Sequence, residues 1–509
     1  MKRRSTLAVS FGLAFAVMVI TSSVEAADAA AKNGKSKKGA ESAKPAIEVV
    51  SLTIHPAAAP KPALKYHLLP TFLESTPGDA VPLYMKALVR HMEIWKDMQN
   101  EALDRFNKNE SPSGFTHFEE WLETPLDKLP RERVRKLADA FGGSVRSQLE
   151  LAVRREHCNW DVPLRQGHVF EILLPEVQEF RNMARIVALR ARLQIAERKF
   201  DEAITSLQTG YGMARHVAKQ PFLVSGLNGL AIANMMNDQV LALCQQAGSP
   251  NLYWSLTELP SPLIDPQTSI EAEYDGLYLQ WPELQTLRHT QYVPEQWDHV
   301  LRKVVSELVG YEDDFARSRA SDKQRAKEIA KTLSHALAEA PRAKAALLAA
   351  GYSQTELDSM PPAQVVLLYS LDICDAIRDE FFQWWHLPYP QAAEGMSRTE
   401  RELPALMKRE IVPFARTLLP HVSIAMSAFA RTERQLAAVR CIEALRIYAA
   451  AHNGQLPPTL DAIKQVPIPL NPMTGKPFPY HLEGKTAVLD ADGGLTSTPR
   501  PQYRIVVAK

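Results

Sequence analysis

Apolar residues recur at helical spacing over most of this 509-residue chain, and no other feature constrains its fold as strongly. Leu88, Met92 and Trp95 show the pattern, because residues three, four or seven apart fall on one face of a helix. Glycine is scarce, with 22 residues, which favours helices. The 36 prolines must lie between helices, because a proline inside a helix removes a backbone hydrogen bond. The sequence therefore predicts a mostly α protein, built as a helical-hairpin array or a bundle.

Changes in composition divide the chain into segments. Residues 27–47 are rich in alanine, lysine, glycine and serine, and they offer too little apolar surface to offset the entropy of ordering them. A cluster of prolines between 250 and 266 marks the end of a first helical region. In chain order we expect a signal peptide at 1–26, a disordered low-complexity tether at 27–47, an extended proline-rich lead-in to the first domain at 48–77, a helical domain at 78–248, a second helical block at 269–400, and a long helix with a small β-hairpin at 401–509.

The first 26 residues predict export. A basic start at Lys2-Arg3-Arg4 is followed by an uncharged apolar run from Leu7 to Ile20, which is too short to span a bilayer comfortably. Val24-Glu25-Ala26 is a small-x-small cleavage site, so we expect cleavage after Ala26. An uncleaved anchor is the alternative. The mature protein is then expected in the periplasm or outside the cell, without a transmembrane span.

Charge and cysteine content exclude several function classes. The net charge of +1 gives no electrostatic argument for nucleic acid as a partner, so no nucleic-acid partner is expected. The four cysteines lie far apart and form no CxxC pair, which argues against a zinc ribbon, a thioredoxin-like redox site or a c-type haem. They are expected to be buried small hydrophobic residues, with one or two disulfides as the alternative in an exported protein. They are Cys158, Cys244, Cys374 and Cys441.

Residues 184–218 contain the pattern of a closely packed helical hairpin. Small residues stand where two helices would cross, at Ala191, Ala203 and Gly210, and Phe200 and Leu207 would pack between them. This segment resembles one tetratricopeptide-type repeat, although the tryptophan and the proline of the family pattern are absent. The resemblance implies an array of α-hairpins that presents a binding surface, whereas the alternative is an ordinary antiparallel helix pair. Such repeats normally occur three or more together, and no clear period is found elsewhere in the chain.

The C-terminal part of the chain combines a long helix with a small β unit. Apolar residues from Leu436 to Ala449 lie on one helical face, Asn453-Gly454 is a suitable C-terminal cap, and Pro457-Pro458 cannot continue the helix. Residues 459–463 predict a short helix. The stretches 477–481 and 486–489 predict two strands around a turn at 483–485.

Together, residues 425–495 resemble the soluble domain of type II secretion pseudopilins and type IV pilins. The stretches 428–434, 440–448 and 452–458 carry the resemblance. True pseudopilins begin with this helix behind a short leader, whereas here the helix stands near the C-terminus and prolines interrupt its apolar half. The resemblance therefore implies the soluble fold reused as an appended domain, and it puts assembly into a pilus in doubt.

Asp490-Ala491-Asp492-Gly493-Gly494 is a fragment of a calcium-loop pattern. Two carboxylates two residues apart can turn towards one hard cation, and members of the pilin family bind calcium in this part of the domain. The complete spacing and the distant glutamate are missing, so a plain turn is the main expectation. No cofactor is expected, with calcium at Asp490 and Asp492 as the alternative.

The segment 372–390 is the best local candidate for a binding site. Asp375 and Asp379, together with Asp372, make one face of a predicted helix acidic, and Trp384, Trp385 and His386 follow. Aromatic rings beside carboxylates could bind a sugar or a peptide, and a carboxylate pair could perform glycosidic acid–base chemistry. The alternative is a solvated helix face followed by rings that fill a core.

These observations favour an exported, non-catalytic scaffold or binding protein of the cell envelope, with protein partners or cell-wall material as ligands. The chain contains no nucleophile elbow, HExxH motif, kinase signature or dinucleotide fingerprint, so catalysis stays undecided, with the balance towards a non-enzyme. One alternative is an exported hydrolase or glycan-binding enzyme with a cleft near 372–390. Another is an accessory component of a secretion or pilus-like machine.

Overall fold

The computed structural model describes residues 47–107, 118–166, 169–172, 174–289, 292–315, 321–418, 422–492 and 500–508. Within these residues, seventeen α-helices and a small sheet near the C-terminus confirm the predicted mostly α fold with a small α+β module. The predicted signal peptide and all of the predicted tether except Ile47 lie outside the described residues. No helix in the described part of the chain is long and apolar enough to cross a membrane.

The first helical region contains α2 to α9. Proline at the first helical position starts α6, and Arg198, with a φ of 63°, turns the chain between α6 and α7. Gly210 of α7 then allows a close crossing, because an added Cβ would lie 2.1 Å from the Met236 sulfur of α8. The helices are α2 (Val81–Asn107), α3 (Glu120–Glu123), α4 (Arg131–Ala140), α5 (Ser144–Ala152), α6 (Pro175–Ala196), α7 (Phe200–Val217), α8 (Leu223–Cys244) and α9 (Tyr253–Thr257).

The second helical region surrounds a separate hydrophobic core. Trp281 and Trp297 are fully buried in it, and Phe414 packs against Trp281 with ring centroids 5.7 Å apart. The helices are α10 (Gln267–Gln280), α11 (Pro294–Phe315), α12 (Asp322–Ala338), α13 (Ala340–Ala349), α14 (Gln354–Ser359), α15 (Pro362–Phe382), α16 (Tyr389–Met407) and α17 (Phe414–Leu418), with the 3₁₀ turns η4 (Pro282–Thr286) and η5 (Gln383–His386).

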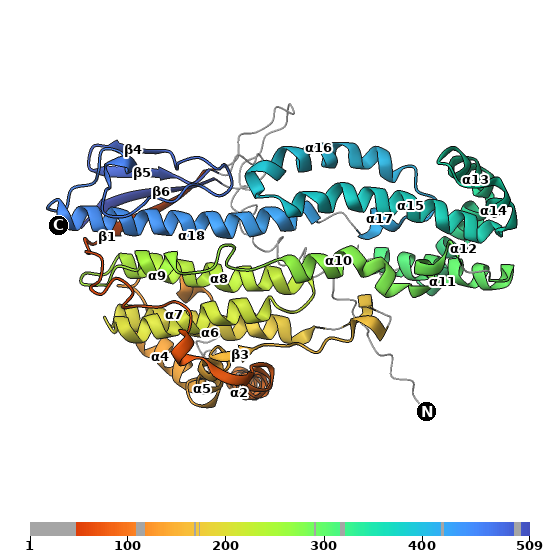
Figure 1. The fold of residues 1–509 in the computed structure, drawn as a ribbon. Coiled ribbons are helices and arrows are strands. Elements are labelled where there is room, and N and C mark those ends of the chain that lie inside the picture. Colours follow the sequence, from red (N-terminus) through yellow and green to blue (C-terminus); the bar gives the residue numbers. More distant parts are fainter. Residues whose placement is uncertain are drawn as a thin grey trace.

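Helix α18 and the strands that follow it belong to the first core rather than to a core of their own. Helix α18 (Val422–Ala451) lies along α8 and α9 and beneath the small sheet (Figure 1). Its residues from Leu436 to Ile447 share one hydrophobic cluster with the helices of the first region and with Leu489 and Ile505 of the sheet. The long C-terminal helix therefore packs as a layer of the first helical region.

The sheet joins the two ends of the described chain. Its strand order is β1 (Ile47–Ile54), β6 (Arg500–Val507), β5 (Thr486–Asp490) and β4 (Tyr480–Glu483). Strand β1 runs parallel to β6, from Ile47 opposite Arg500 to Ile54 opposite Val507, whereas the β4–β5 hairpin turns at Gly484 with a φ of 64°. The hairpin lies where the sequence predicts it, but its first strand is Tyr480–Glu483 and not 477–481. Residues 48–77 were predicted to lead into the first domain. In the structure, however, the strand at 47–54 pairs with β6 and completes the C-terminal sheet.

All four cysteines are buried as free thiols. Burial raises the pKa of the Cys158 and Cys441 thiols to about 12, so both are protonated at neutral pH. Cys244 lies close to Glu443, and its thiol donates to a carboxylate oxygen at 3.4 Å. The cysteines therefore serve as small core residues in this structure.

A buried histidine makes the first core sensitive to acid. Burial is the main cause that lowers the pKa of His216 from 6.5 to about 3, and its Nδ1 lies 3.0 Å from the Tyr84 hydroxyl. As the pH falls below 6.5, His216 is protonated in the unfolded chain but stays neutral in the folded protein. Folding stability is therefore expected to fall by up to about 4–5 kcal/mol as the pH approaches 3.

Urea unfolding across this pH range measures the effect. His216→Gln keeps an acceptor for Tyr84 but cannot titrate, so the stability of this variant should depend less on pH between 6.5 and 3. The matched control is His481→Gln, because the side chain of His481 is 59% exposed. This variant should show the same loss of stability between pH 6.5 and 3 as the wild type. Equal acid sensitivity of wild type and His216→Gln contradicts the prediction.

Candidate functional site

The acidic face of α15 lies against tyrosines from other elements. Asp372, Asp375 and Asp379 follow at helical spacing, so all three project from the same side of α15. Each accepts a hydrogen bond from a tyrosine hydroxyl. The pairs are Tyr352 with Asp372 at 2.7 Å, Tyr278 with Asp375 at 2.6 Å, and Tyr274 with Asp379 at 2.7 Å.

Two arginines neutralise these carboxylates. The Arg378 guanidinium lies 2.9 Å from Asp375 and 3.2 Å from Asp379, and it stacks over the Tyr274 ring at 3.9 Å from the centroid. Arg288 pairs with Asp372 at 2.8 Å. Burial, the largest influence, raises the pKa of the Asp375 carboxyl above its usual value. The acidic face is therefore a charged clamp that joins α15 to α10 and to the loop after η4.

A groove of about 720 Å³ opens beside this clamp. Leucines from α10, η4 and α15 and charged side chains of both signs contribute to its lining. Among the described residues, Arg165 and Asp275 at this groove form no ion pair and are exposed, so their charges are free to meet a ligand. The lining residues are Arg165, Asp275, Tyr278, Leu279, Pro282, Leu284, Gln285, Leu287, Arg288, Leu371 and Asp375.

The structure separates the aromatic candidates from the acidic ones. Trp384 packs against Gly395 of α16 and donates to the Thr399 hydroxyl at 3.2 Å. Trp385 meets Phe429 of α18 edge-on, with ring centroids 5.8 Å apart. These rings fill a small hydrophobic cluster between helices and do not line the groove. His386 is exposed at the end of η5.

Of the predicted binding residues, only Asp375 lines the groove. Asp379 stands one turn further along α15, and its side chain is 59% exposed. Sequence reasoning missed Tyr278, Arg288 and Arg165, which come from segments far from α15. One local signal could have found Tyr278, because Tyr274 and Tyr278 stand four residues apart and so share one face of α10.

The predicted calcium residues face an arginine. Arg500 donates to Asp490 through both Nε and Nη2, and its Nη1 lies 3.5 Å from Asp492. Asp490 also accepts from the backbone N–H of Asp492 at 3.1 Å, which closes the turn. A guanidinium thus stands where a cation would compensate the two carboxylates. Within the described residues, no group of three or more His, Cys, Asp and Glu side chains could hold a metal ion.

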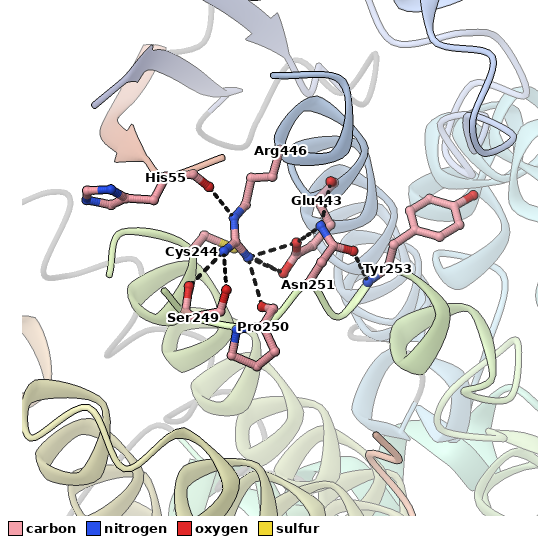
Figure 2. A network of polar contacts seen from close by, with 8 residues as sticks. All are labelled: His55, Cys244, Ser249, Pro250, Asn251, Tyr253, Glu443 and Arg446. Carbon is pink, nitrogen blue, oxygen red and sulfur yellow. Dashed lines mark hydrogen bonds and ion pairs between the residues drawn. The ribbon is translucent and has the colours of Figure 1, made fainter. Parts of the chain in front are cut away.

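A second polar cluster lies inside the first core. Figure 2 shows Arg446 of α18 reaching between the end of β1 and the loop that follows α8. Its Nε donates to the His55 carbonyl at 2.8 Å, and Nη1 lies 2.9 Å from Glu443 Oε2. Nη2 donates to the carbonyl and to the hydroxyl of Ser249 at 3.0 and 2.7 Å, and Nη1 also donates to the Pro250 carbonyl at 3.1 Å.

This cluster is structural rather than a ligand site. The side chains of Glu443 and Arg446 are both fully buried, and Asn251 donates to the Glu443 carboxylate and to its backbone carbonyl. All the polar groups of the guanidinium are therefore satisfied inside the protein, with no face left for a ligand. The cluster links β1, the loop after α8 and α18, which are far apart in the sequence.

Comparison of the chain with protein-family models, with curated proteins and with solved structures found no match. The two family resemblances consequently rest on the residue patterns alone. The chemistry of the groove beside α15 is the main guide to function.

Proposed function

We propose that this protein is an exported, non-catalytic binding protein of the cell envelope that holds its ligand in the groove beside α15. The observation that carries the proposal is the groove itself. Its volume of about 720 Å³ lies in the range of about 300–1,000 Å³ typical of small-molecule sites. Its lining also combines leucines with a few charged side chains that could orient a ligand.

The charges on the groove wall favour a ligand that carries both signs. Arg165 can meet a carboxylate and Asp275 can meet an ammonium group, because neither is neutralised by another described residue. Leu279, the least buried of the lining leucines, can contact a short aliphatic side chain. A short zwitterionic peptide of the cell-wall type has all of these groups, and the periplasm or the cell exterior contains such peptides.

A hydrolase is the second candidate, and the environment of Asp375 favours it. A carboxyl group with a raised pKa that lines a groove could act as a general acid. Its contacts with Tyr278 and Arg378, however, already occupy the carboxylate and hold it against α10. These contacts support a positioning role within a binding site over proton transfer.

Isothermal titration calorimetry of the mature protein tests the proposal with two probes. One is the zwitterionic peptide L-Ala-D-Glu-meso-diaminopimelate, and the other is the uncharged disaccharide diacetylchitobiose. The peptide is expected to bind, and Arg165→Gln or Asp275→Asn should each weaken binding by about 10-fold or more, since a charged hydrogen bond contributes about 1.5–3 kcal/mol. Both residues are exposed, so neither change should lower the melting temperature.

The matched control is Arg302→Gln, because Arg302 is exposed on α11 and lies outside the groove lining. It should bind the peptide as the wild type does. Cleavage of a peptide or glycan that is lost in Asp375→Asn would replace the proposal by the hydrolase. If neither the peptide nor the disaccharide binds, the groove is not the ligand site.

A further inference from the structure

Phe72 and Leu73 form the most exposed apolar pair of the described chain. They are 91% and 93% exposed, whereas the next large apolar side chain, Val89, is 59% exposed. The two residues are adjacent on the 3₁₀ turn η1 (Phe72–Glu74), in the segment that leads from β1 to α2. A soluble protein gains nothing by presenting an aromatic and an aliphatic side chain to water in this way, so such exposure indicates a contact surface.

The turn holds this pair in a defined position. The Thr71 backbone N–H and hydroxyl both donate to the Glu74 carboxylate, at 2.8 and 3.1 Å, and the Glu74 N–H donates back to the Thr71 carbonyl at 3.0 Å. Directly after the turn, the Thr76 N–H donates to the Arg154 carbonyl at 2.8 Å. The exposed pair, which we name the Phe72–Leu73 finger, is thus fixed at its base rather than carried on a loose loop.

The size and surroundings of the finger decide which partner fits. Its two side chains offer roughly 400 Å² of apolar surface, about half of the 800 Å² that each partner of a stable protein pair buries. Inserting two such side chains into a bilayer interface, however, needs no matching pocket. Strand β2 (Thr76–Asp79), which follows the turn, pairs with β3 (Arg155–His157), and this pairing places the cations Arg154 and Arg155 near the base of the finger.

We propose that the Phe72–Leu73 finger inserts into the interfacial layer of a lipid bilayer and attaches the protein to the membrane reversibly. Phenylalanine and leucine enter the boundary between headgroups and acyl chains readily, and nearby arginines suit lipid phosphates. Glu74 stays bonded to Thr71 at the level of the headgroups. The attachment involves none of the groove residues, so it is independent of the proposed ligand site.

Sedimentation with vesicles tests the attachment. The mature protein is mixed with vesicles of phosphatidylethanolamine and phosphatidylglycerol, and separately with phosphatidylcholine vesicles. The wild type should bind both, and stronger binding to the first would show that headgroup charge contributes. Phe72→Ser with Leu73→Ser should lower the partition coefficient by about 100-fold or more, since two large apolar side chains no longer leave water.

The matched control is Val89→Ser with Met92→Ser, an exposed apolar pair on α2, which should bind vesicles as the wild type does. Both double variants should keep the wild-type melting temperature. A second readout uses Phe72→Trp, whose added fluorescence should shift to the blue and be quenched by lipids brominated near the headgroup. Equal partition of the wild type and the serine finger variant, or a wild type that binds neither vesicle, overturns the proposal.

Discussion

Replacing Arg446 by alanine is expected to destabilise the protein by about 3–5 kcal/mol or more, because it leaves a buried carboxylate without its cation. The guanidinium is fully buried and donates to Glu443, to Ser249 and to the His55 and Pro250 carbonyls. Without it, Asn251 and the Cys244 thiol are the only side chains of the described residues that still donate to Glu443. The midpoint of urea unfolding, followed by far-ultraviolet circular dichroism, measures the loss.

Three further variants show where the loss arises. Arg446→Lys keeps the charge but lacks the donors needed for all of these acceptors, so its loss should be smaller yet clear. The double variant Glu443→Leu with Arg446→Met removes both charges and should lose less than the sum of the single changes. The surface control is Arg504→Ala, whose exposed pair with Glu483 should contribute no more than about 1 kcal/mol. The prediction is wrong if Arg446→Ala loses less stability than Arg504→Ala.

Removing β1 is expected to have the second large effect. A chain that begins at Pro56 lacks the strand that pairs with β6, and it lacks the buried side chains of Leu52 and Ile54. Burial of these two side chains contributes about 3–6 kcal/mol, and the loss of the His55 carbonyl leaves one Arg446 donor unpaired. Strand β6 would also become an exposed edge, so we expect a lower melting temperature and aggregation.

The matched control is a chain that begins at Ile47, which keeps every described contact of β1. Thermal melting and size-exclusion chromatography compare the two chains. A synthetic peptide of residues 47–55, added to the shorter chain, should raise its melting temperature by binding beside β6. If the chain that begins at Pro56 melts with the control and stays monomeric, β1 contributes little and the prediction is wrong.

Local features of the chain were predictable because each depends on residues close together. The cap at Asn453-Gly454 follows from backbone preferences that neighbours alone decide. The hairpin of β4 and β5 follows from alternating apolar residues around a glycine turn. The acidic face of α15 was also visible, since helical spacing places Asp372, Asp375 and Asp379 on one side.

The partners of these features could not be read from the chain. Helical spacing indicates which face is buried, but many other faces in the same protein are equally apolar. The groove needs Tyr278 and Arg288 beside Asp375, and the calcium-like turn at Asp490 meets Arg500. Trp384 and Trp385 follow the acidic face in the sequence, but in the structure they pack against α16 and α18.

The sequence by itself thus determined the mostly α class, the long helix near the C-terminus and the small hairpin after it, because backbone preference and periodicity act over a few residues. Only the tertiary structure decided that α18 shares a core with α8, that β1 completes the C-terminal sheet and that Arg446 meets the His55 carbonyl, 391 residues away in the chain. Such pairings depend on how two distant surfaces match in shape and in hydrogen-bonding groups, and this match exists only once both surfaces have formed.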